Sequence, residues 1–179
     1  MRSLLYLFLA AASLLLSGCT SVAPRPTEIR AEGDVRISGR LSVQVAGSTG
    51  RASGGNAGFE LSGNPRAGQL ELSTPLGSLL ARATWGPAEA VLQTPGAERS
   101  FADLDALTRE LLGEAIPVAA LFDWLRGRPW PQTPSDTWQD GVGFSQLGWR
   151  IDLAGLQDGL IVATRSAEPA VTLRARVEP

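Results

Sequence analysis

The sequence predicts an α+β fold: an antiparallel sheet curved into an incompletely closed barrel and capped by helices. Three observations lead to this prediction. Short segments of alternating apolar and polar residues occupy both ends of the chain, Gly- and Pro-containing turns separate them, and one central stretch has helical periodicity. Strands grouped on either side of a helical insert are typical of α+β proteins, because parallel α/β folds alternate the two element types regularly.

Residues 1–18 are predicted to be a lipoprotein signal peptide. The run from Leu4 to Leu16 is apolar, too short for a comfortable membrane span, and no stop-transfer segment follows it. The sequence LLSGC then resembles the lipobox of bacterial lipoproteins, in which the cysteine, here Cys19, is acylated. An ordinary signal peptide with an incidental cysteine is the alternative. Cys19 is the only cysteine, so the chain can form no intramolecular disulfide.

Residues 19–34 are predicted to be the acylated cysteine and a flexible tether, because this stretch is small, polar and contains proline. Fifteen flexible residues reach roughly 20 Å, which keeps the folded domain, residues 35–179, close to the bilayer. In proteobacterial lipoproteins an aspartate after the cysteine tends to retain the protein at the inner membrane. Thr20 occupies that position here, so we expect a lipid anchor in the outer membrane of a Gram-negative bacterium, with the domain facing the periplasm.

The first predicted strand, residues 35–45, alternates over eleven residues. Ile37, Leu41 and Val43 fall on one face and polar residues on the other, as in an antiparallel sheet with one solvated face. The Gly/Ser-rich residues 46–58 are predicted to form a loop. Further short strands are expected at 58–63, 69–73, 80–85 and 89–94, and again at 142–148, 149–155, 159–165 and 170–177.

A helical insert is predicted over about residues 100–127. Leucines at 104, 107, 111 and 112 have helical spacing, with Ser100 as the expected N-cap. A second helix is expected to begin near Pro117 and to present Leu121 and Phe122, and Gly127 should end it.

The residues needed for catalysis are scarce. The chain has no histidine, which removes a Ser-His-Asp triad and the commonest metal ligand. The sequence GGNAG lacks the lysine of a phosphate-binding loop. The carboxylate pairs Asp103/Asp105 and Glu110/Glu114 fit a solvated helix surface. We therefore expect no enzyme, no cofactor and no metal site. The formal net charge of −2 and the absence of a basic stripe argue against nucleic-acid binding.

One turn carries an unusual residue. In the sequence TPLG, Leu76 lies between Pro75 and Gly77 at the tip of a predicted hairpin, where polar residues or glycine are usual because the tip faces water. The leucine either projects into solvent or folds back onto the body of the domain.

Four features in order resemble the LolB family of outer-membrane lipoproteins: the lipobox, GRLSV in the first strand, the hairpin STPLGS, and the insert LLGEAIPVAALFDWLRGRP. The similarity covers nearly all of the chain from about residue 36. The resemblance implies an open antiparallel β half-barrel with a helical lid over a hydrophobic cavity, and a protruding loop whose leucine is Leu76. It further implies a receptor that accepts acylated lipoproteins from the periplasmic carrier LolA and inserts them into the outer membrane.

A cavity for acyl chains would be lined by apolar residues of the inner sheet face and the insert, although the same residues could instead pack into a solid core. The candidates are Ile37, Leu41, Val43, Phe59, Leu61, Leu70, Leu72, Trp85, Leu121, Phe122, Trp124 and Trp149. The expected partners are LolA, the acyl chains of client lipoproteins and outer-membrane lipids, and the chain is expected to be a monomer. A scaffold lipoprotein without a ligand, a lipid-modifying enzyme and a carrier of free lipids remain the alternatives.

Overall fold

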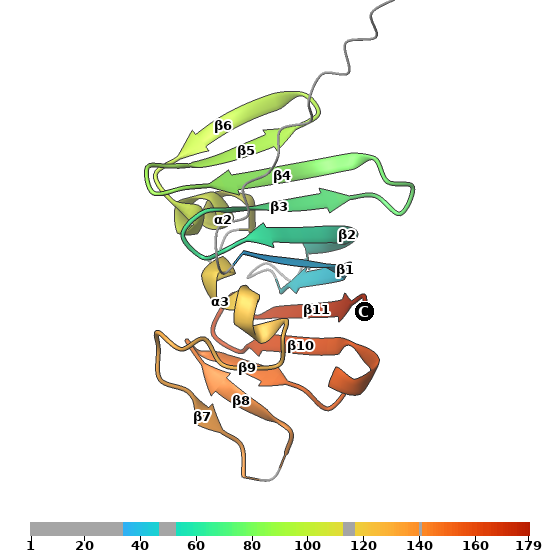
Figure 1. Cartoon of the computed structure of the whole chain (residues 1–179), viewed down its shortest axis with the longest axis vertical. Helices are drawn as coiled ribbons and strands as arrows, with labels where there is room; N and C mark the ends of the chain where they lie inside the picture. The colour runs from blue at the N-terminus through green and yellow to red at the C-terminus, as the bar shows by residue number, and fades with distance from the viewer. Residues whose placement is uncertain (1–33, 47–52, 113–116, 140) are drawn as a thin grey trace, which may run out of the picture.

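The computed structural model describes residues 34–46, 53–112, 117–139 and 141–179. Its strands form one antiparallel sheet in the order β6-β5-β4-β3-β2-β1-β11-β10-β9-β8-β7 (Figure 1). Strands that are neighbours in the sheet also follow one another along the chain, with one exception. The exception is the pair β1 and β11, which joins the two ends of the domain. The strands are β1 (Val35–Val45), β2 (Ser53–Gly63), β3 (Gly68–Ser73), β4 (Leu79–Trp85), β5 (Ala90–Thr94), β6 (Ala97–Phe101), β7 (Asp136–Thr137), β8 (Gly143–Gln146), β9 (Trp149–Asp152), β10 (Leu160–Arg165) and β11 (Val171–Val177).

The central strand β1 pairs with β2 over its whole length, from Val35 opposite Gly63 to Val45 opposite Ser53. The prediction of a loop over residues 46–58 was therefore wrong at its C-terminal end, where residues 53–57 belong to β2. Glycines and serines give no alternating apolar signal, but their backbone groups pair with β1 as well as those of any other residue.

The sheet bends sharply where β1 meets β11. Pairing between these strands begins at Gly39, opposite Val177, while β1 continues toward its N-terminus beside β2 alone. A Cβ atom at Gly39 would overlap the backbone oxygen of Arg176 and lie 3.0 Å from Cε1 of Phe59. Glycine at this position therefore permits the close approach that curves the sheet.

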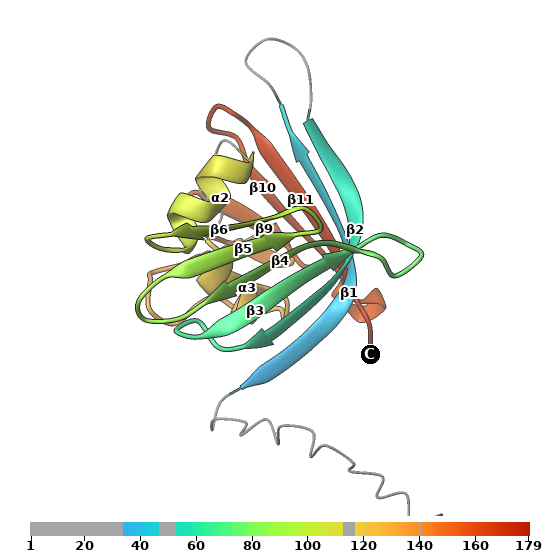
Figure 2. The same cartoon turned by 90° about the horizontal axis from the view of Figure 1, so that it is seen from above.

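Two helices lie on the concave side of the sheet, as Figures 1 and 2 show: α2 (Leu104–Leu112) and α3 (Val118–Trp124). Ser100 is not the N-cap of α2, because it lies in β6, paired with Val91. The cap is Asp103, whose Oδ1 accepts a hydrogen bond from the backbone N–H of Ala106 at 2.7 Å. The strand β6 was not predicted from the sequence, because this edge strand is mostly exposed and its residues do not alternate between apolar and polar.

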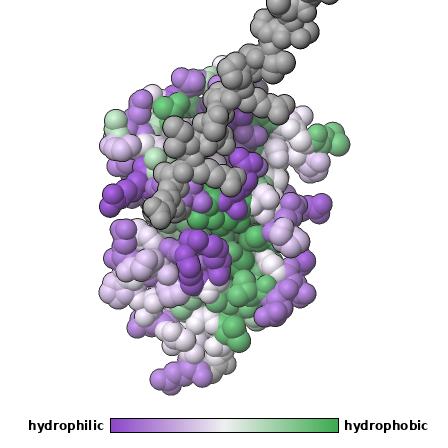
Figure 3. All heavy atoms as spheres, in the orientation of Figure 1, coloured by the Kyte–Doolittle hydropathy of each residue, from purple (hydrophilic) through white to green (hydrophobic). Residues whose placement is uncertain are grey.

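The core lies between the concave sheet face and the helices. Figure 3 shows a band of hydrophobic residues in the middle of the face that α2 and α3 occupy, with hydrophilic residues beside it and along the margins. The α3 residue Phe122 packs edge-on against Trp85 of β4, with ring centroids 6.1 Å apart, and Trp124 packs against Trp149 of β9 at 6.2 Å. The predicted α+β fold, an open half-barrel with a helical lid, is confirmed.

Candidate functional site

The turn between β3 and β4 is held by three short hydrogen bonds around Thr74. Its backbone N–H donates to the oxygen of Ser78 at 2.8 Å, and its backbone oxygen accepts from the N–H of Gly77 at 2.9 Å. Its Oγ1 accepts from the N–H of Ser78 at 3.1 Å. Gly77 has a φ of 82°, as in three-residue hairpin loops that end in a left-handed residue. Pro75 restricts the first position of the loop, so the chain presents Leu76 on a well-defined turn.

The side chain of Leu76 is 95% exposed, which excludes the alternative that it folds back onto the described domain. In Figures 1 and 2 the turn projects on the side of the molecule opposite α2 and α3. A second leucine of the same hairpin, Leu80, is 42% exposed next to an irregularity in the β3–β4 pairing. The sequence reading assigned Leu80 no role.

The twelve candidate cavity residues all lie in the core or pack against it, but in two different environments. Four are only partly buried: Leu41, Val43, Leu70 and Leu72. Eight are buried: Ile37, Phe59, Leu61, Trp85, Leu121, Phe122, Trp124 and Trp149. Leu61, Phe122 and Trp124 are at most 1% exposed, so these three side chains belong to a packed interior in this state.

A small apolar cavity of about 100 Å³ remains between the sheet and the helices α2 and α3. The candidates Leu70 and Leu72 of β3 line it. The other lining residues are Ala81, Ala83, Leu92, Leu104, Leu107, Thr108 and Val118. Ligand pockets in proteins usually measure ~300–1,000 Å³. The cavity is therefore a small void beneath a closed lid.

A wider, open cleft of about 640 Å³ lies at the far end of β4 from the leucine turn. At ~3.3 Å per residue, the length of β4 separates the two by roughly 20 Å. Trp85 and Trp149, both candidates, line this cleft together with Trp130 and Leu147, which the sequence reading did not select. Charged residues at its margin include Arg66 and Glu89, so an apolar ligand would enter past a polar rim.

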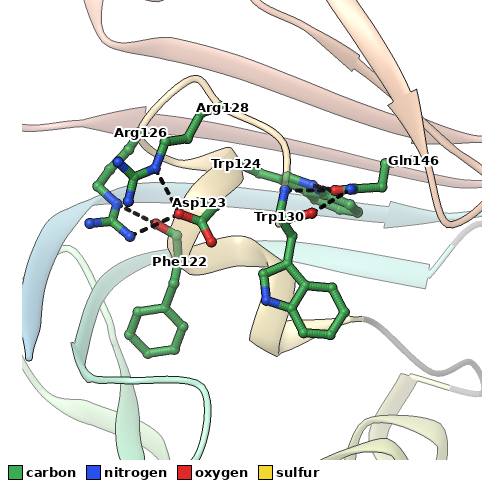
Figure 4. A network of polar contacts seen from close by, with 7 residues as sticks. All are labelled: Phe122, Asp123, Trp124, Arg126, Arg128, Trp130 and Gln146. Atoms are coloured by element: carbon green, nitrogen blue, oxygen red, sulfur yellow. Dashed lines mark hydrogen bonds and ion pairs between the residues drawn. The ribbon is translucent and has the colours of Figure 1, made fainter. Parts of the chain in front are cut away.

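Gln146 of β8 attaches α3 and the segment after it to the sheet (Figure 4). Its Oε1 accepts hydrogen bonds from Nε1 of Trp124 at 2.8 Å and from the backbone N–H of Trp130 at 2.9 Å. Its Nε2 donates to the backbone oxygens of Trp130 and Thr133 at 2.8 and 2.7 Å. Gln146 is 3% exposed, and both the carbonyl oxygen and the amino group of its side-chain amide make two hydrogen bonds, so this end of the lid is firmly anchored.

The C-terminal end of α3 carries an ion-pair cluster, also drawn in Figure 4. Asp123 accepts from Arg126 at 3.0 Å and from Arg128 at 2.7 Å, and Nε of Arg126 donates to the backbone oxygen of Phe122 at 2.7 Å. These contacts satisfy the end of the helix and position the following turn. Among the described residues, no three acidic, histidine or cysteine side chains come together as metal ligands would.

Cys19, the signal peptide and residues 19–33 of the tether lie outside the described residues. None of the helices in the described ranges has the length and hydrophobicity needed to cross a bilayer.

Known proteins resemble this chain over most of its length. A sequence model of the family described as "Outer membrane lipoprotein LolB" matches residues 34–173. An outer-membrane lipoprotein LolB of Bordetella petrii is 36% identical over 172 residues, covering 91% of this chain and 85% of the relative. The proteins of the same description from Cupriavidus pinatubonensis and Chromobacterium violaceum are 36% and 33% identical, covering 89% and 84% of this chain and 78% and 81% of their own lengths. The chain therefore belongs to the LolB family of outer-membrane lipoproteins.

Proposed function

We propose that this protein, anchored at Cys19, accepts acylated lipoproteins from the periplasmic carrier LolA and inserts them into the outer membrane. The observation that carries the proposal is the near-complete exposure of Leu76 on a hydrogen-bonded turn of a domain whose concave face is apolar. Membership of the LolB family supports it.

Acyl chains need an enclosing surface during transfer. At ~0.8 kcal/mol per methylene, exposing one long chain to water costs on the order of 10 kcal/mol. The apolar cavity of about 100 Å³ is too small for such a chain. We infer that accepting a client moves α2 away from the sheet. Residues Leu104, Leu107 and Thr108 of this helix form one wall of the cavity, and the helix contacts the edge strand β6 and its neighbour β5.

Leu76 would act at the release step. Burying one leucine in a bilayer gains ~1.5–3 kcal/mol, which is too little to anchor a protein but sufficient to orient one that is already tethered. Thr74 and Gly77 hold the turn in shape, so little conformational entropy is lost on insertion. Transfer would proceed downhill, from the carrier to this receptor and then to the bilayer that holds the chains most favourably.

The test is a reconstituted transfer assay in which receipt of a LolA-bound lipoprotein and its insertion into vesicles are measured separately. We expect Leu76→Glu to bind the client normally and to insert it at least 10-fold more slowly, since a leucine contributes ~1.5 kcal/mol or more to membrane contact. Val142→Glu is the matched control, because Val142 is an apolar residue that is 62% exposed in the bend before β8, away from the leucine turn.

Insertion by a folded Leu76→Glu protein at the unmodified rate would contradict the role of the turn. A fluorescent fatty acid offered in place of the lipoprotein separates the alternatives. A carrier of free lipids would release it to vesicles as efficiently, and a solid scaffold would bind neither compound.

A further inference from the structure

Strand pairing brings three arginines of the outer sheet face close to the leucine turn. Arg176 of β11 lies directly opposite Arg40 of β1, Arg40 opposite Gly58 of β2, and Gly58 opposite Ser73 of β3. Ser73 is the last residue before the turn. Because neighbouring strands are ~4.8 Å apart, Arg40 lies roughly 10 Å from the base of the turn along this row. Arg174, two residues before Arg176, lies diagonally across from Arg40.

These arginines are placed where they repel one another. Like charges directly opposite in an antiparallel pair destabilise a sheet. Arg36 on the same face is paired with Glu60, and Arg82 with Glu71. Within the described ranges, by contrast, the side chains of Arg40 and Arg174 are exposed and make no hydrogen bond or ion pair.

The same arginines line a groove of about 680 Å³ that extends to the turn. Arg40, Arg174 and Arg176 form one part of its lining, and Thr74, Pro75 and Gly77 form another. Gly58 lies between them, and a Cβ at this position would come within 2.8 Å of Oγ of Ser73, so glycine keeps the groove open. Arg176 donates one hydrogen bond of 3.3 Å to the backbone oxygen of Asp158, which leaves its charge uncompensated. Among the described residues that line the groove, Glu178 is the one acidic residue, so this lining is formally positive.

We propose that this groove binds the phosphate-containing headgroups of anionic phospholipids at the membrane surface when Leu76 enters the bilayer. Arginine guanidinium groups recognise phosphate through paired, charge-assisted hydrogen bonds. An interfacial apolar group lies ~5–10 Å deep at the boundary between headgroups and acyl chains. Arg40 is level with Ser73, the residue at the base of the turn, so a turn inserted to that depth brings the arginines beside its base to the headgroup layer. The inference rests on the proposed insertion of the turn and adds the class of lipid that the turn meets, namely anionic phospholipids.

The test compares binding of the mature chain, residues 19–179 with Cys19→Ala to remove the acyl anchor, to two kinds of vesicle. One contains phosphatidylcholine alone, and the other contains phosphatidylcholine with phosphatidylglycerol. We expect the double variant Arg40→Gln/Arg174→Gln to bind the anionic vesicles about 30-fold more weakly. Each arginine near a negative membrane surface strengthens binding roughly fivefold, and the two effects multiply. Its binding to phosphatidylcholine vesicles should change little.

The matched control is Arg36→Gln/Arg99→Gln, which removes the same charge from two arginines that have carboxylate partners elsewhere on the domain. It should keep most of the binding to anionic vesicles. Leu76→Ala should weaken binding to both vesicles, and failure of this variant alone counts against insertion of the turn and not against the groove. Equal losses in the two double variants, or no loss in the first, would overturn the assignment. Displacement from anionic vesicles by inorganic phosphate at an ionic strength matched with chloride would show a site for free phosphate and would also overturn it.

Discussion

Substituting leucine for Ala83 tests whether the void beneath α2 is the place where an acyl chain enters. Ala83 lies on the inner face of β4, is 7% exposed and lines the cavity of about 100 Å³. The leucine side chain adds three carbon atoms directed into this space. Cavities destabilise folded proteins by ~24 cal/mol per Å³, so filling this one should stabilise the fold by up to about 2 kcal/mol. The same substitution should block entry of an acyl chain between the sheet and the helix.

The control is Ala175→Leu. Ala175 is also a buried alanine of the same sheet, on β11, but it is fully buried and does not line the cavity. Adding three carbons there should cost about 1–3 kcal/mol through overpacking. Urea unfolding followed by tryptophan fluorescence measures both free energies, and receipt of a lipoprotein from LolA measures function. The reasoning fails if Ala83→Leu destabilises the domain as Ala175→Leu does, or if it stabilises the domain and leaves receipt unchanged.

Three further substitutions test the framework around the site. Gln146→Leu removes four hydrogen bonds and leaves the buried indole N–H of Trp124 unpaired. The free energy of unfolding should therefore fall by about 3 kcal/mol, with a loss of near-ultraviolet circular dichroism. An unchanged urea midpoint would contradict the anchoring role of Gln146. Gly39→Ala places a methyl group against the backbone oxygen of Arg176 and should cost at least about 2 kcal/mol in the same measurement, whereas a neutral result would show that the bend does not depend on this contact. Leu147 has a φ of 52° in the two-residue turn between β8 and β9. Leu147→Asn should raise the thermal midpoint of unfolding, because asparagine adopts this left-handed conformation more easily than leucine. A lower midpoint would mean that the leucine makes a stabilising contact.

Much of the fold could be predicted because the signals are local. The alternation in residues 35–45 corresponds to β1, and Ile37 lies on the buried face as the period of two requires. The leucine spacing that begins at 104 corresponds to α2. The turn chemistry of Pro75 and Gly77 correctly identified a hairpin with Leu76 at its tip, and the structure decided that this leucine is exposed. Each of these features depends on neighbouring residues and on the requirement that one face be buried.

What the sequence by itself determined is therefore most of the elements, their inner faces and the hairpin turn that carries Leu76. Only the tertiary structure decided how these parts meet. The pairing that places Arg40 opposite Arg176 joins strands from opposite ends of the chain, and no local pattern encodes which residues face each other across such a pair. Likewise, whether Leu70 and Phe122 line a void or a packed interior depends on how closely helix and sheet approach, because wall and core use the same apolar residues.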